Sequence, residues 1–215
     1  MKTILTSLAL TTIISSPVIA DDWANYEVTI TNATNHQVLT PPLLVTHNDK
    51  FQLFSVGNPA SDGLVLQAET GDPSVLYGEV NGARGVNEVV TGGAPIVYGQ
   101  SATFQISARK KSLLSFSAML ATTNDGFAAL NAVPLPKDSA QYFAFAYDAG
   151  SEMNNENCSY IPGPPCTPES GNARTETGEG FIAIHNGIYG GSDLNPKHLD
   201  WRGPVAVITI TRNNK

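Results

Sequence analysis

Alternating apolar and polar residues recur along most of the chain, which is the pattern of β-strands with one buried face. The pattern is clearest at residues 26–31 and 142–147, and the second stretch ends abruptly at Asp148-Ala149-Gly150. Further strands are predicted at residues 43–47, 51–56, 103–106, 114–120, 181–185 and 205–211. We expect the strands at 103–106 and 114–120 to form a hairpin around a basic tip at residues 109–111.

Two segments between these strands predict short helices. Asn58 precedes Pro59 and Asp72 precedes Pro73, and apolar residues follow each pair. A capping side chain followed by proline at the first helical position is typical of a helix start. Residues 82–93 are expected to be mostly loop.

About eight strands with short helical insertions predict an all-β fold, an antiparallel β-sandwich. A parallel sheet would require helices that alternate regularly with the strands, and the pattern lacks them. We find no internal repeat and no linker rich in proline, glycine or serine. The sequence therefore predicts a single domain at residues 21–215.

Residues 1–20 have the three parts of a secretory signal peptide. Lys2 gives a basic start, residues 4–14 are largely apolar, and residues 15–20 end in Ala20 as a cleavage region. The alternative is a buried N-terminal helix. No other stretch reaches the length of about 18 apolar residues that a membrane span needs. We therefore expect a secreted or periplasmic protein without a transmembrane segment.

The net charge argues against nucleic acid as a partner. The whole chain has a formal charge of −7, and removal of Lys2 with the signal peptide, which contains no acid, gives −8. An acidic protein is not drawn to phosphate backbones unless it has a local basic patch. The cluster Arg109-Lys110-Lys111 is better explained as a solvated turn. We expect a monomer.

The two cysteines, Cys158 and Cys166, both lie in the part that would be exported. An oxidising compartment makes a disulfide the expected state of such a pair. A zinc-binding or catalytic pair is not favoured, because neither CxxC spacing nor suitable histidine partners accompany the cysteines.

Acidic residues follow two of the predicted strands. Asp125 and Asp148 each come at a strand end, Glu152 lies four positions after Asp148, and residues 154–157 add three asparagines and a glutamate. If both strands end at the same end of the sandwich, the three carboxylates can converge. Calcium accepts six to eight oxygen ligands, whereas zinc favours His or Cys and magnesium requires a stricter octahedron. The same spacing also fits aspartates that only cap turns.

Several segments resemble the spondin domain, a module of F-spondin, of mindin and of single-domain secreted bacterial proteins. The segments are residues 26–32, Pro41-Pro42, 51–57, 124–127, 147–152 and 201–210, and together they extend over nearly all of the expected mature chain. The most specific element is the strand followed by Asp148-Ala149-Gly150-Ser151-Glu152.

The resemblance implies a C2-like antiparallel β-sandwich with a calcium site on loops at one end. The family's aspartates correspond to Asp125 and Asp148, and its third acid to Glu152, where family members commonly have Asp. The insertion at residues 154–172, with its cysteine pair, resembles the bacterial branch of the family. The adhesion partners of the animal proteins are therefore not carried over.

These observations predict a non-enzymatic, calcium-binding module for adhesion or another interaction with an extracellular or envelope protein or glycan. Calcium would order the loops at one end, although it could also be purely structural. The alternative is a metal-independent, hydrolase-like enzyme in which His47 or His185 works with a carboxylate. Trp201-Arg202 is either an exposed aromatic and cation pair for a ligand or a packing contact.

Overall fold

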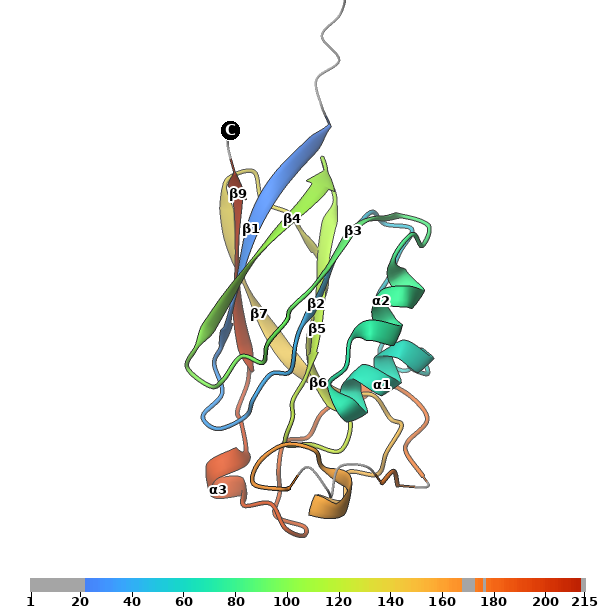
Figure 1. The fold of residues 1–215 in the computed structure, drawn as a ribbon, viewed down its shortest axis with the longest axis vertical. Coiled ribbons are helices and arrows are strands. Elements are labelled where there is room, and N and C mark those ends of the chain that lie inside the picture. Colours follow the sequence, from blue (N-terminus) through green and yellow to red (C-terminus); the bar gives the residue numbers. More distant parts are fainter. Residues whose placement is uncertain (1–21, 168–172, 176, 214–215) are drawn as a thin grey trace, which may run out of the picture.

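The computed structural model describes residues 22–167, 173–175 and 177–213. The expected signal peptide at residues 1–20 lies outside this range. Within it, antiparallel strands form two packed layers with a few short helices (Figure 1). The prediction of an all-β, antiparallel sandwich with short helical insertions is confirmed.

The strands are β1 (Trp23–Asn32), β2 (Leu43–His47), β3 (Val86–Thr91), β4 (Ser101–Arg109), β5 (Leu113–Met119), β6 (Gly126–Pro134), β7 (Ser139–Asp148), β8 (Ala183–Ile184) and β9 (Ala206–Asn213). The helices are α1 (Asp62–Thr70), α2 (Ser74–Val80), the 3-10 helix η1 (Cys158–Tyr160) and α3 (Pro196–Leu199). No helix in this part of the chain is long and apolar enough to span a bilayer.

The strand order is β3-β2-β5-β6-β7-β9-β1-β4, and β8 pairs with β7 outside this path. Strand β7 belongs to both layers. Its first part, residues 139–144, pairs with β9, and its last part, residues 145–148, pairs with β6. The end strands β3 and β4 approach each other, because the Ser107 N–H donates to the Glu88 carboxylate. The sheet therefore nearly closes on itself.

The main core fills the space between the two layers. Its largest fully buried members include Ile30, Leu39, Leu44, Ile106, Leu114, Phe116 and Leu120. A second core lies between α1 and α2 and the outer face of β2 and β6, where Leu64 and Leu76 pack with Leu43 and Phe127. Figure 1 shows the two helices against this layer.

The prediction that residues 103–106 and 114–120 form a hairpin is wrong. Strand β4 pairs with β1, and β5 pairs with β2 and β6, so the basic turn connects the two layers. Alternation predicts that a segment is a strand, but it does not identify the strand's partners.

Three local expectations also need correction. Residues 51–56 do not form a strand; Phe54 packs edge-on against Phe127 and Tyr147 at ring distances of 5.3 and 4.9 Å. Residues 82–93 include strand β3. Helix α1 exists, but its N-cap is Ser61, whose hydroxyl accepts a hydrogen bond from Leu64 N.

Candidate functional site

The loops that follow β5, β7 and β8 gather at one end of the sandwich, which we call the rim (Figure 1). Pairing between β6 and β7 places Gly126 opposite Asp148. The N–H of Ala149 also donates to the carbonyl of Asp125 at 3.1 Å. The two acid-bearing loops therefore lie next to each other, and both aspartates are buried.

The turn after β7 depends on Gly150. This residue has a φ of +70°, and a Cβ at its position would lie 2.2 Å from the carbonyl oxygen of Phe181. Its N–H donates to Asp148 Oδ1 at 2.7 Å. The turn directs the N–H groups of Ser151 and Glu152 at Asp125 Oδ2, at 2.7 and 2.9 Å. One oxygen of Asp125 is thus fully engaged by the neighbouring loop.

Two other carboxylate oxygens are buried without a partner. Asp125 Oδ1 and Glu152 Oε2 accept no hydrogen bond within the part of the chain that the structure describes. Asp125 is 0% exposed and Glu152 is 1% exposed. An unsatisfied buried acceptor typically costs about 1–3 kcal/mol, and more when it carries charge. These two oxygens are therefore the feature of the rim that most requires an explanation.

Burial changes the protonation of this cluster. Burial, and after it the charge of Asp148, together raise the pKa of Asp125 to about 7, although the hydrogen bonds from Glu152 and Ser151 favour the charged form. Burial also raises the pKa of Asp148, against the hydrogen bonds from Gly150 and Asn154. A buried carboxylate surrounded by other acids is unfavourable in its charged form unless a cation is present.

Glu152 extends the acidic region toward α1. Its pKa is raised to about 7, mainly by burial and in smaller part by the charges of Glu69 and Asp125. The Thr175 N–H and the charge of Arg174 oppose this rise. Glu69 is buried and forms an ion pair with Arg174 at 2.6 Å. Glu69 and Glu152 line a cavity of about 220 Å³. Glu69 could not be predicted as part of the site from the sequence, because an acid on a short helix normally faces solvent.

The three predicted ligands do not form a ready metal cage. Within residues 22–167, 173–175 and 177–213, no group of three or more His, Cys, Asp or Glu side chains is arranged to hold a metal ion. Both oxygens of Asp148 accept hydrogen bonds, from Gly150 N and from the side-chain amide of Asn154. The residues nevertheless fit calcium in type, because the unpartnered groups are carboxylate oxygens.

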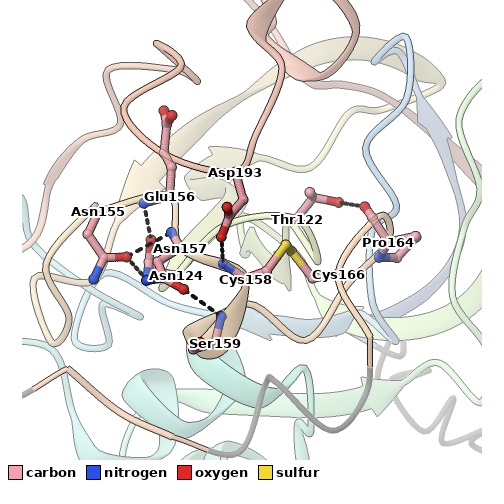
Figure 2. Close-up of a disulfide and its surroundings, with 10 residues drawn as sticks. All are labelled: Thr122, Asn124, Asn155, Glu156, Asn157, Cys158, Ser159, Pro164, Cys166 and Asp193. Atoms are coloured by element: carbon pink, nitrogen blue, oxygen red, sulfur yellow. Dashed lines mark hydrogen bonds between the residues drawn. A yellow bond between two sulfur atoms is a disulfide. The ribbon is translucent and has the colours of Figure 1, made fainter.

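A disulfide joins Cys158 and Cys166, as expected from the sequence, and Figure 2 shows its surroundings. The Cys158 N–H donates to Asp193 Oδ2 at 2.9 Å, and the Thr122 hydroxyl donates to the carbonyl of Pro164 at 2.7 Å. The disulfide therefore lies where three rim loops are connected.

Glu156 organises the rim instead of offering a free ligand. Its backbone has a φ of +55°, which is unusual for a residue other than glycine. Its carboxylate accepts hydrogen bonds from the N–H groups of Tyr189, Gly190 and Gly191 at 2.6–2.7 Å. Its own N–H donates to Asn124 Oδ1 at 3.3 Å (Figure 2). The sequence places Glu156 among the oxygen-bearing residues after Asp148, but it does not reveal these contacts with residues 189–191.

His47 lies in the core. Its Nε2 is 2.8 Å from Ser115 Oγ and its Nδ1 is 2.9 Å from the carbonyl oxygen of Asn48. This arrangement has the partners of a serine–histidine dyad, but His47 and Ser115 are both 0% exposed. A substrate cannot reach them in this structure.

His185 lies behind the rim. Its Nδ1 accepts a hydrogen bond from Gly187 N at 3.0 Å, and its Nε2 has no partner within the described chain. It borders a cavity of about 10 Å³, which is near the minimum for one water molecule. Neither His47 nor His185 is hydrogen-bonded to a carboxylate in the part of the chain described.

The fold and the rim define a class, namely an antiparallel β-sandwich with buried acids on loops at one end. Comparison with known proteins adds no family to this description. No protein-family model matches the sequence, and no curated protein matches it.

Proposed function

We propose that the chain is a non-enzymatic interaction module of the spondin type that binds calcium at its rim. Asp125, Asp148 and Glu152 would hold the ion, and the partner would be an extracellular or envelope protein or glycan. The location would be secreted or periplasmic, in keeping with the disulfide.

The observation that carries this proposal is the pair of unpartnered oxygens, Asp125 Oδ1 and Glu152 Oε2. Both belong to carboxylates whose pKa values are raised to about 7, so their charged forms lack stabilisation from the protein alone. A bound calcium ion would supply positive charge and accept oxygen ligands. Asp148 would contribute in addition to its present hydrogen bonds, since each carboxylate oxygen has two lone pairs.

The proposed mechanism is ordering of the rim. Asp125 receives the N–H groups of Ser151 and Glu152, and Asp148 receives the Asn154 amide, so these carboxylates fix the start of the loop after β7. Mutual repulsion of the acids would loosen this loop, and neutralisation would hold it in one conformation. A partner would then meet a preformed surface.

Calcium titration of chelator-treated protein tests this proposal. We expect calcium at about 100 times its Kd to stabilise the fold by about 2.7 kcal/mol, which raises Tm by about 5–10 °C. Isothermal titration calorimetry should give one site, with a weaker response to magnesium. The Asp125→Asn variant should lose both effects.

Asp138→Asn is the matched control, because Asp138 is exposed and lies outside the rim. It should respond to calcium as the unmodified chain does. The proposal is wrong if calcium gives neither heat nor a shift in Tm, or if Asp125→Asn keeps the full response.

A further inference from the structure

An open cavity of about 620 Å³ lies at the rim, beside α3. Its lining includes two cations, two aromatic residues, one amide and one acid, namely Lys197, Arg202, Tyr189, Trp201, Asn186 and Asp200. The size falls within the range of about 300–1,000 Å³ that is usual for small-molecule sites. None of these residues is among the proposed calcium ligands.

The charge of this cavity is opposite to that of the whole chain. Lys197 is exposed and its side chain has no hydrogen-bond or ion-pair partner in the described part of the chain. Asp200 is already engaged, because Oδ1 accepts from Ile188 N at 3.0 Å and Oδ2 accepts from Arg202 Nε at 3.2 Å. The Arg202 side chain remains 95% exposed. The lining therefore has two cations and one acid, a formal charge of +1, in a chain of net charge −7, and Lys197 is its unpaired cation within the described residues.

The aromatic residues give the cavity flat apolar surfaces. Trp201 is half-buried, contacts the ring of His185 at 5.0 Å, and also lines the cavity. Tyr189 is 63% exposed, and its hydroxyl donates to the carbonyl of Asn154 at 2.8 Å. Aromatic faces carry negative electrostatic potential and attract polarised C–H groups, which a sugar ring presents.

We propose that this cavity binds an acidic sugar residue, with its anionic group at Lys197 and Arg202 and its ring against Trp201 or Tyr189. The guanidinium of Arg202 can hold a carboxylate or a sulfate through paired N–H groups, and Lys197 adds a point charge. Asn186 supplies an amide for the sugar hydroxyls. This inference rests on the proposed interaction function and names the chemistry of its glycan.

The wall of the cavity is connected to the proposed calcium loop. Tyr189 N–H donates to Glu156, the Tyr189 hydroxyl donates to Asn154, and the Asn154 amide donates to Asp148. Loosening of the loop after β7 would therefore displace Tyr189. Chelation should weaken sugar binding without abolishing it, because Lys197, Arg202 and Trp201 lie on another segment.

The test uses tetragalacturonate as the carboxylated probe, a sulfated galactose tetramer as the sulfated probe, and methyl-esterified tetragalacturonate as the uncharged one. Calorimetry is performed on the full mature chain. We expect at least one acidic probe to bind about tenfold or more tightly than the ester, and the better acidic probe identifies the anion. The double variant Lys197→Ala/Arg202→Ala should lose about tenfold in affinity for it, as expected when charge-assisted hydrogen bonds are removed.

The double variant Lys50→Ala/Lys137→Ala is the charge-matched control, because both lysines are exposed and distant in sequence from the cavity. It should retain the affinity of the unmodified chain. Equal affinity for the ester, an equal loss in both double variants, or no binding of either acidic probe would overturn the inference.

Calcium binding is measured on the same samples, which separates the two proposals. Loss of the calcium response in Lys197→Ala/Arg202→Ala is not expected, since neither residue is a proposed ligand. Acidic-sugar binding without any calcium response would overturn the proposed calcium site and leave the cavity inference standing. A calcium response without acidic-sugar binding would overturn the cavity inference and leave the proposed calcium site standing.

Discussion

Burial controls the charge of single residues at the rim, and His185 shows this most directly. The side chain is 8% exposed and contacts the ring of Trp201. Burial lowers the pKa of His185 to about 4, although the nearby carboxylates of Glu156 and Asp200 favour the charged form. The desolvation of an imidazolium therefore outweighs the attraction of two acids. The folded protein holds this histidine neutral over a wide range of pH.

We predict that His185 makes the fold acid-sensitive. Between pH 6.5 and 4 the unfolded chain binds a proton at this site and the folded chain does not, so the free energy of unfolding falls as pH falls. A pKa shift from 6.5 to about 4 corresponds to about 3 kcal/mol over this range. In urea unfolding, the free energy of unfolding of the His185→Phe variant should fall by about 3 kcal/mol less between pH 6.5 and 4 than that of the unmodified chain.

The exposed His36 provides the control. The His36→Gln variant should keep the pH dependence of the unmodified chain. If the free energy of unfolding of His185→Phe changes with pH as that of the unmodified chain does, His185 is not the source of the acid sensitivity.

At the scale of elements, the turn between β7 and the rim is set by backbone contacts. Gly150 combines a positive φ with a position where a Cβ would lie 2.2 Å from Phe181 O and 2.7 Å from Phe181 N. Gly57 also has a positive φ, but a Cβ there would meet nothing within 4 Å. Comparing alanine substitutions at the two glycines therefore separates the cost of the positive φ from the cost of the clash with Phe181.

We predict that Gly150→Ala is much more damaging than Gly57→Ala. Each substitution places alanine in the left-handed region, which costs about 1–2 kcal/mol. Only Gly150→Ala must also move the backbone of Phe181, which adds about 1–3 kcal/mol, as overpacking does. Urea unfolding of both variants measures the difference, and equal destabilisation would contradict the contact.

The sequence predicted most of the strands and helices but fewer of the pairings between strands. Alternation located β1 and β7 well, because each presents a buried face at a period of two residues. The short strand β2 is buried on both faces and was predicted from its apolar run after Pro41-Pro42. Alternation missed β3, whose residues are nearly all half-buried, and β6, whose first five residues are all buried, because neither has an alternating pattern. It could not show that β4 and β5 belong to different layers, because pairing is decided by contacts between distant segments.

For the whole molecule, the rim contains little regular structure and depends on crosslinks. The disulfide, the Cys158–Asp193 hydrogen bond and the Glu156 contacts to residues 189–191 join segments that have few strand hydrogen bonds of their own. The two layers have extensive ladders and a large apolar core instead. The stability of the rim and that of the sandwich should therefore respond differently to perturbation.

We predict that replacing both Cys158 and Cys166 with serine destabilises the chain by about 2–3 kcal/mol, from the entropy of a short closed loop. The loss should be concentrated in the rim, so limited proteolysis should cut the rim loops before the strands of the two layers. Reduction of the unmodified protein should have the same effect. Cleavage that begins in the strands of the serine variant or of the reduced protein would contradict this division.

The candidate site was predictable only in part. Asp125, Asp148 and Glu152 stood out because each follows or adjoins a strand end, and the structure places them in adjacent loops. Glu69 and Arg174 did not, because their contact with the rim depends on how α1 packs across the sheet. The cavity beside α3 likewise brings together residues whose individual patterns are unremarkable.

Strand β7 pairs with β9 along residues 139–144 and with β6 along residues 145–148. Because a shift by one residue turns every side chain to the opposite face, an insertion or deletion inside β7 would disrupt both ladders together. Most other strands could confine such a change to one layer. Natural length variation among related chains should therefore accumulate in the loops and leave the span from Ser139 to Asp148 constant.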